Sequence, residues 1–361
     1  MRYFFSHLQK EFYMKKLSSM VLASAILGGT TLFGAGIATL ESVKGTPASL
    51  DASDAAWAKA KEISVPLTET PYKPDGYKGM LKSTAVIKSL YDDKNIYIKL
   101  QYDDPTYSID RQPWVKQEDG SWKQLKVLDQ AGQDNTYYED KAALFWNINT
   151  KGFEKKGCAI ACHITKDGKN NGFDDTSAGR KYTNNPGETI DMWHWKGVRT
   201  GLSFNQTHDQ YVDSTNDPKL NKEWGRKGDA QESGGYKNNI NEAKTGPAFM
   251  NKDPKDNAIG SIKDENKVPF VDTFKPGDKI PGPIVTKHTG SAGDIETSAV
   301  WKDGKWTLVM KRALVTTAPK DAEQDVQFND LKKPYFFGVA AFDNSQINHV
   351  YHDGAIELKF K

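Results

Sequence analysis

The stretch AVIKSLYDDKNIYIKLQY, residues 85–102, decides the fold class of this chain. Two runs rich in β-branched and aromatic residues, Ala85–Tyr91 and Ile96–Tyr102, flank four turn-forming residues, Asp92–Asn95. In the second run, apolar side chains at the even-numbered positions alternate with tyrosine, lysine and glutamine at the odd-numbered ones. This period of two is typical of a strand. The stretch therefore predicts an antiparallel hairpin with one buried face.

Similar strand signals recur along the chain, and one short segment, 51–61, has a helical pattern. The further predicted strands are Lys141–Ile148, Thr189–Val198, Ala299–Trp301, Trp306–Lys311, Tyr335–Phe342 and Ala355–Phe360. Many short strands, few helices and long excursions predict an all-β protein, an antiparallel β-sandwich with long loop insertions and few short helices.

The composition excludes several classes of protein. The 361 residues include 37% hydrophobic residues, which is typical of a globular chain and argues against a fibrous or disordered one. Lys and Arg number 49 against 47 Asp and Glu, a net charge of +2. A balance this even supplies no overall field for binding nucleic acid.

The N-terminal residues resemble a secretory signal. An apolar stretch, Met20–Ala38, follows Lys15 and Lys16 and ends in small residues. We expect a signal peptide over residues 1–38, with the true start at either Met1 or Met14, and cleavage after Ala38. Glycines interrupt the stretch, so a stable membrane anchor is the weaker alternative. The mature chain is expected in the periplasm.

The rest of the chain, residues 39–361, is expected to form a single domain. Within it, residues 213–268 turn polar, with only isolated aromatic residues. This composition predicts a long surface insertion, partly mobile.

The strongest chemical signal is the segment Cys158-Ala159-Ile160-Ala161-Cys162-His163. A c-type haem needs two thiols for its vinyl groups and an adjacent imidazole for its iron, and the usual spacing is C-x-x-C-H. Here three residues separate the cysteines instead of two. One extra residue lengthens the loop by up to about 3.5 Å. The segment remains compatible with covalent haem attachment.

Other uses of Cys158 and Cys162 stay open at this point. In an oxidising compartment the pair could form a disulfide, with His163 as a bystander. A zinc site is weaker, because two cysteines and one histidine supply only three ligands and no second Cys/His cluster has finger-like spacing. A catalytic thiol is weaker still, because no residue is evident that would orient His163.

A second axial ligand for such a haem has several candidates. Met192 and His194 share one face of the predicted strand at 189–198. On its other face, Trp193 and Trp195 could either wall the haem, together with Phe145 and Trp146, or fill the sandwich core.

Four stretches of the chain resemble the ethylbenzene dehydrogenase γ-subunit type of haem-binding domain, also described as the cytochrome c-552/dimethyl sulfoxide reductase-like haem-binding domain. They are DAAWAKAKEISVPL (54–67), VIKSLYDDKNIYIKLQYDDPT (86–106), DMWHWKGVRT (191–200) and AFDNSQINHVYHDGAIELKF (341–360). The resemblance implies a β-sandwich related to family 9 carbohydrate-binding modules. It also implies one haem and electron transfer in the periplasm.

In the γ-subunit branch, the haem is a noncovalent b type with methionine and lysine ligands, and it serves a molybdenum enzyme. This chain departs from that branch because it carries Cys158, Cys162 and His163, and because Arg180–Thr183, where the methionine would be sought, contains none. The departures indicate a member with one covalent haem c, in which His163 is the proximal iron ligand.

The resemblance also suggests where the opposite ligand lies. In the b-type relatives the lysine ligand lies well downstream of the methionine, and the comparable region here is near AFDNSQINHVYH. We expect His349 to be that ligand, with His194 and then Met192 as rivals. A histidine on a strand next to a turn can face inward while its other ring nitrogen bonds a backbone carbonyl.

The leading hypothesis is therefore a periplasmic monohaem c-type cytochrome that transfers electrons, either as a stand-alone protein or as the haem subunit of a respiratory oxidoreductase, and the hypothesis favours an electron carrier over an enzyme. Its expected partners are redox proteins, with a molybdenum oxidoreductase of the dimethyl sulfoxide reductase type as one candidate. The alternative from another class is a carbohydrate-binding sandwich with a Cys158–Cys162 disulfide. A third hypothesis, a catalytic haem enzyme, requires an open iron position.

Overall fold

The hairpin expected at 85–102 is present in the computed structural model as β3 (Ser83–Tyr91) and β4 (Asn95–Asp103). The Asp92 carboxylate accepts hydrogen bonds from the backbone N–H groups of Lys94 and Asn95, both at 2.8 Å, which fixes the turn. One face of the hairpin is buried, as predicted, and the other is partly buried, with Leu90 and Tyr97 covered near the turn. Tyr97, on the face expected to be polar, packs against Trp57.

The structure describes residues 37–72, 79–129, 132–163, 169–170, 173–174 and 179–361. Of the expected signal peptide only Ile37 and Ala38 are among these residues, so the signal peptide itself lies outside the described part. Residues 37–361 form one compact unit. No helix in the described part is long and apolar enough to span a membrane.

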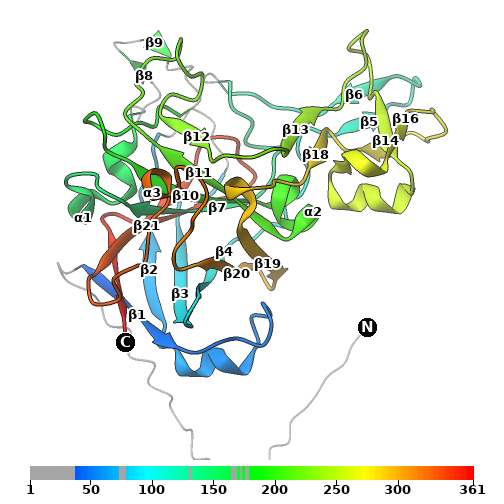
Figure 1. The fold of residues 1–361 in the computed structure, drawn as a ribbon. Helices are drawn as coiled ribbons and strands as arrows, with labels where there is room; N and C mark the ends of the chain where they lie inside the picture. The colour runs from blue at the N-terminus through cyan, green and yellow to red at the C-terminus, as the bar shows by residue number, and fades with distance from the viewer. Residues whose placement is uncertain (1–36, 73–78, 130–131, 164–168, 171–172, 175–178) are drawn as a thin grey trace, which may run out of the picture. The chain divides into compact units, whose positions relative to one another are not determined.

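Thirteen of the described strands belong to one continuous sheet (Figure 1). Besides β3 and β4 they are β1 (Ala38–Lys44), β2 (Ile63–Leu67), β7 (Lys141–Asn147), β10 (Ile190–Lys196), β11 (Gln206–Val212), β12 (Arg226–Gly228), β19 (Ile295–Lys302), β20 (Lys305–Ala313), β21 (Tyr335–Phe342), β22 (Val350–Tyr351) and β23 (Ile356–Phe360).

The order of the main path is β1-β23-β21-β7-β10-β11-β19-β20-β4-β3-β2, and β1 also pairs with β3. The sheet therefore closes on itself and folds into two facing layers. The main core joins side chains of both layers, such as Trp146 and Trp193 from one and Ile98 and Trp306 from the other. The predicted all-β sandwich is confirmed. Its one departure from antiparallel pairing is β1, which is parallel to both β23 and β3.

Smaller sheets lie outside this sandwich. Their strands are β5 (Trp114–Lys116), β6 (Trp122–Gln124), β8 (Lys169–Asn170), β9 (Phe173–Asp174), β13 (Gly235–Asn238), β14 (Phe249–Asn251), β15 (Ile262–Lys263), β16 (Lys267–Pro269), β17 (Lys279–Ile280) and β18 (Pro283–Thr286). Residues 213–268, read from sequence as a polar insertion, contribute to these sheets. They help to enclose a small apolar cluster around Trp114, Ile262 and Ile280.

The helices in the described residues are few and short, as expected. They are η1 (Ala55–Lys59), α1 (Phe153–Lys156), η2 (Cys158–Ala161), η3 (Gly197–Gly201), α2 (Leu202–Phe204), η4 (Pro254–Ile259), η5 (Asp264–Asn266), η6 (Ser291–Gly293) and α3 (Asp321–Gln324). The segment expected to be helical at 51–61 contains η1. The segment with both cysteines begins with η2 and lies over the outer face of β7, β10 and β21.

Candidate functional site

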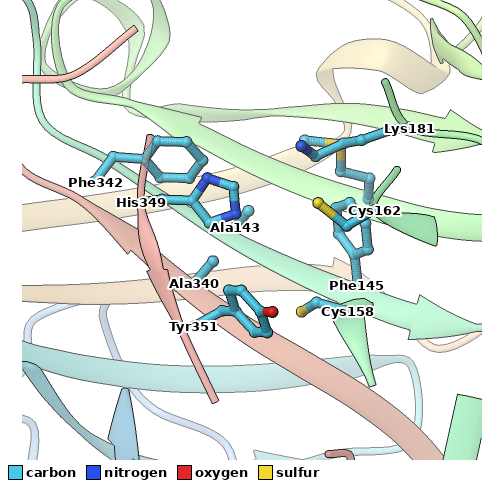
Figure 2. A pocket seen from close by; sticks show the side chains of 10 residues that line it. Ala143, Phe145, Cys158, Cys162, Lys181, Ala340, Phe342, His349 and Tyr351 are labelled. Carbon is cyan, nitrogen blue, oxygen red and sulfur yellow. The ribbon is translucent and has the colours of Figure 1, made fainter. Parts of the chain in front are cut away.

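One cavity gathers most of the residues that the sequence singles out. Its walls come from β7, β10, β21 and β22 and from the cysteine segment (Figure 2). The lining residues are Ala143, Phe145, Cys158, Cys162, Lys181, Met192, Ala340, Phe342, His349 and Tyr351. Its enclosed volume is about 20 Å³. The lining is mostly apolar and contains no carboxylate.

Two glycines fix the position of Cys158. Gly157 has a positive φ of 51° and forms a bridge with Gly354, and a Cβ there would lie 1.9 Å from the Gly354 carbonyl oxygen. Gly338, on β21, leaves the space that the thiol occupies, because a Cβ at that position would lie 2.3 Å from Cys158 Sγ. The cysteine segment thus sits close to the sheet only because both glycines lack a side chain.

Both cysteines are free thiols, and both sulfur atoms face the cavity (Figure 2). Burial raises the pKa of the Cys158 thiol to about 12, so this sulfur is protonated at neutral pH. The Cys158–Cys162 disulfide of the alternative hypothesis is not formed in this structure. The backbone of Cys162 forms an isolated antiparallel β-bridge with that of Lys181, whose side chain also lines the cavity.

His349 reaches the same cavity from the opposite wall (Figure 2). Its Nδ1 bonds the Ile347 carbonyl oxygen at 2.8 Å, and its ring lies 4.4 Å from that of Phe342. Burial first, and then the charge of Lys181, hold the pKa of His349 well below its usual value. The ring is therefore neutral. Since Nδ1 bonds a carbonyl oxygen, it carries the ring proton, and Nε2 has a lone pair available as a ligand.

The rival ligands lie on the same face of β10. Met192 lines the cavity next to Phe145 and Phe342. His194 is buried two residues further along. Its Nδ1 bonds Gln210 Oε1 at 3.0 Å, and its Nε2 has no hydrogen-bond partner among the described residues.

His163 does not line the cavity. Its ring stacks on Tyr182, with a centroid distance of 3.7 Å, and its Nε2 bonds the Tyr182 carbonyl oxygen at 3.0 Å. The His163 imidazole therefore lies outside the cavity that the sulfur atoms of Cys158 and Cys162 face (Figure 2).

Trp193 and Trp195 lie on the other face of β10, inside the sandwich. Both are fully buried and belong to the main core, where Trp193 contacts Trp146 and Trp195 contacts Trp306. They do not line the cavity. Of the four aromatic residues considered from sequence, Phe145 alone does so.

A second cavity, of about 110 Å³, adjoins the first, and the two share Lys181, Met192 and Phe342 as lining residues. It adds the basic side chains of Lys141, Arg199 and Arg226 and the carboxylate of Glu223, which pairs with Arg226. Sequence reasoning missed the basic residues, since each stands in a different segment with nothing local to distinguish it from a solvated charge. Burial holds the pKa of Lys141 well below its usual value.

Comparison with known proteins places the chain in a family. The family model described as ethylbenzene dehydrogenase matches residues 54–354. This chain belongs to the ethylbenzene dehydrogenase family. The resemblance noted in the sequence is thereby confirmed at the level of the family.

For this member of the ethylbenzene dehydrogenase family, no curated protein gives a match. Among solved structures, it is similar to a family 9 carbohydrate-binding module of Caldicellulosiruptor kristjanssonii in complexes with glucose and with cellotriose. The identities are 9% and 8%, and the TM-scores are 0.33 and 0.32. The matches cover 90% of this chain and 95% and 94% of those chains.

The contact between Gly338 and Cys158 gives a first test of the site in this ethylbenzene dehydrogenase family member. Gly338→Ala should lower the free energy of unfolding by about 1–3 kcal/mol, because the new methyl group overlaps the thiol. Urea unfolding measures the change. Gly246→Ala is the matched control, since its Cβ would come no closer than 3.5 Å to any atom that it meets. Equal stability of the two variants would contradict the described packing.

Proposed function

We propose that this protein carries one covalently attached haem c in the cavity at Cys158 and Cys162 and uses it to transfer electrons. One observation carries the proposal. Two free thiols from one segment and a neutral imidazole from a distant one, His349, converge on the same apolar space. This is the donor set that a haem c requires.

The thiols have the chemistry that attachment needs. Each thioether forms when a cysteine S–H adds across a vinyl group, so that sulfur bonds one vinyl carbon and the hydrogen goes to the other. Burial raises the pKa of Cys158 and so keeps this sulfur in its less reactive, protonated form while the segment is closed. The enclosed volume of about 20 Å³ is far smaller than a haem. Entry of the macrocycle would therefore require the Cys158–His163 segment to move outward.

Two residues, His163 and His349, would hold the iron. His163 belongs to the attaching segment and would have to turn away from Tyr182 to do so. His349 needs no such change, because its bond to the Ile347 carbonyl already orients the ring. His194 and Met192 remain the rivals for this second position.

Basic side chains beside the cavity could bind the propionate groups of a haem. The porphyrin carries two propionates, and Lys141, Arg199 and Arg226 line the adjoining space. Arg199 already forms an ion pair with the buried Glu139. Arg226 is likewise paired, with Glu223 on the wall of the same space, so we expect Lys181, which lines both cavities, to contact a propionate.

When bound, the haem supplies one-electron redox chemistry. The protein's own contribution is to exclude water with Phe145, Phe342 and Tyr351 and to set the potential through its axial ligands. We propose a periplasmic electron carrier or haem subunit, whose partners are redox proteins. Membership of the ethylbenzene dehydrogenase family supports a molybdenum oxidoreductase as one such partner.

A pyridine haemochrome spectrum tests the proposal. The protein should be expressed with its leader, together with the host's machinery for cytochrome c maturation, and purified from the periplasm. A covalent haem c spectrum with one haem per chain is the expected result. Complete absence of haem from correctly folded protein would refute it and leave the sugar-binding alternative in place.

The identity of the second axial ligand can be decided by spectroscopy. With His349 as ligand, His349→Ala should convert a six-coordinate low-spin spectrum to a high-spin one, whereas His194→Ala should leave it low-spin. The reverse result would assign the ligand to His194. A long-wavelength sulfur-to-iron charge-transfer band in the oxidised wild-type protein would instead favour Met192.

A further inference from the structure

A group of buried carboxylates lies away from the haem cavity, where four separate segments meet. Asp209 is in β11, Asp229 follows β12, Asp294 precedes β19 and Asp325 follows α3. One oxygen each from Asp209, Asp294 and Asp325 lies within 4.8 Å of the other two. Asp209 pairs across the sheet with Trp193, so it projects from the face opposite Met192.

Several carboxylate oxygens of this group lack hydrogen-bond donors, although Asp209 Oδ1 accepts from Gln210 N and Asp325 Oδ2 accepts from Thr316 Oγ1. Among the described residues, nothing donates a hydrogen bond to Asp209 Oδ2, Asp294 Oδ1 or Asp325 Oδ1. A buried carboxylate oxygen left without a partner is costly, because it has lost its water and gained nothing in return. A structure that keeps several of them together indicates that another group completes the site.

Asp229 supplies an independent observation that points to the same place. It is 3% exposed, and neither of its carboxyl oxygens has a donor in the described part of the chain. Burial and the adjacent Asp325 carboxyl raise the pKa of Asp229 to about 10. Two carboxyl groups this close need either a proton or a cation between them.

The protein's own positive charge is insufficient for this group. Arg312 is the cation within it, and its guanidinium lies 2.8 Å from Asp191 and 3.5 Å from Asp209. One guanidinium therefore faces Asp191 and the four carboxyl groups named above. The excess of acidic groups is the charge that a bound divalent cation would balance.

We propose that Asp209, Asp229, Asp294 and Asp325 bind one calcium ion. Calcium prefers six to eight oxygen ligands at about 2.3–2.6 Å, so oxygens on opposite sides of the ion are about 5 Å apart. The 4.8 Å limit on the separations among Asp209, Asp294 and Asp325 matches that size, and Asp229 adjoins Asp325. The absence of nitrogen and sulfur among these donors disfavours zinc. The ion would tie β11, β12, β19 and the end of α3 together.

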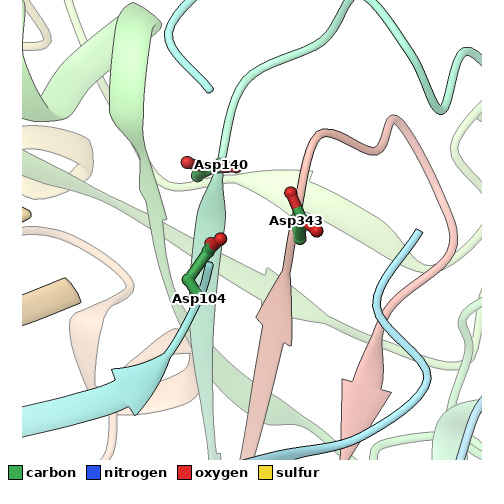
Figure 3. A group of neighbouring side chains, drawn as sticks. All are labelled: Asp104, Asp140 and Asp343. Atoms are coloured by element: carbon green, nitrogen blue, oxygen red, sulfur yellow. The ribbon is translucent and has the colours of Figure 1, made fainter. Parts of the chain in front are cut away.

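A second trio of neighbouring carboxyl groups, Asp104, Asp140 and Asp343, differs from the first group in its hydrogen bonds (Figure 3). Asp140 accepts hydrogen bonds from Ser108 N at 2.8 Å, Asn344 N at 2.9 Å and Trp306 Nε1 at 3.0 Å. Asp343 accepts one from Thr106 Oγ1 at 2.7 Å. Within this trio, Asp104 Oδ2 is the one buried oxygen without a described donor. Donors of the protein already stabilise most of it.

Thermal unfolding of the full mature protein tests the proposal. The protein is stripped with EDTA, desalted and melted with and without calcium chloride, and bound calcium is counted by elemental analysis. We expect one calcium ion per chain and a melting temperature raised by about 5 °C at saturating calcium. Magnesium chloride at the same concentration should have a much smaller effect, because Mg²⁺ demands stricter octahedral geometry.

Asp229→Asn and Asp325→Asn separate a calcium site from a proton-sharing cluster. Each should abolish the calcium-dependent shift while leaving the calcium-free melting temperature equal to or above that of the wild type, since the neutral amide has the same size and can donate a hydrogen bond to a neighbouring carboxylate. Asp104→Asn is the matched control and should keep the shift. No calcium and no shift in the wild-type protein would overturn the proposal. So would a shift that survives both variants or disappears only with Asp104→Asn.

Discussion

Replacing both Cys158 and Cys162 with alanine should abolish covalent haem. The two sulfur atoms face one cavity, and the chain contains no other cysteine that could take their place. On a denaturing gel stained for haem peroxidase activity, the wild-type protein should give a band at its own mass and the double variant none. A band that persists in the double variant would show that attachment occurs elsewhere or that the stain reports trapped haem.

Two further variants separate attachment from iron ligation. Met192→Leu changes the lining of the same cavity but removes no thiol, so it should keep the stained band. His163→Ala should retain some covalent haem and yet alter the Soret band, because it removes an iron ligand and leaves both cysteines. If His163→Ala had an unchanged spectrum, the ring stacked on Tyr182 would be its functional position, and another residue would hold the iron.

Replacing Arg312 with methionine should cause the largest loss of stability expected here, about 3–5 kcal/mol. The guanidinium is fully buried, pairs with Asp191, Asp209 and Asp325, and also donates to the Val326 carbonyl. Methionine fills a similar space but leaves buried carboxylates without their cation. Denaturant unfolding in the presence of EDTA measures the loss while preventing any metal ion from masking it.

Lys311→Met is the matched control for this experiment. Lys311 is the preceding residue in β20, and its ion pair with Glu296 is largely exposed. Exposed pairs of this kind contribute about 1 kcal/mol or less. Similar losses in the two variants would mean that burial of the Arg312 network does not determine its contribution.

The alternation of side chains predicted where the strands lie, but it did not decide which face of each strand points into the core. In β10 the sequence separates Met192 and His194 from Trp193 and Trp195. Both faces are apolar enough to be core, so the pattern alone does not say which one faces the cavity. Tertiary packing decides it, because the tryptophans fill the space between the two layers.

Charged residues were the least predictable part of the molecule. Lys141, Arg199 and Arg226 come from three separate segments and meet only because β7, β10, β11 and β12 are neighbours in the sheet. The same holds for Asp209 and Asp325, each of which looks like an ordinary solvated carboxylate in sequence. Local patterns carry no information on such groups, since long-range pairing alone creates them.

The closure of the sheet through β1 makes folding depend on strands that are far apart in the sequence. Thr39 in β1 donates a hydrogen bond to Glu357 in β23, 318 residues away in the sequence. The pairing of β1 with β23 therefore requires that β23 has already been synthesised. The cavity at Cys158 and Cys162 also depends on this part of the sequence, which supplies Ala340, His349 and Tyr351 to its walls. A chain that stops short of β21 would keep both thiols but would lack the opposing wall of the cavity.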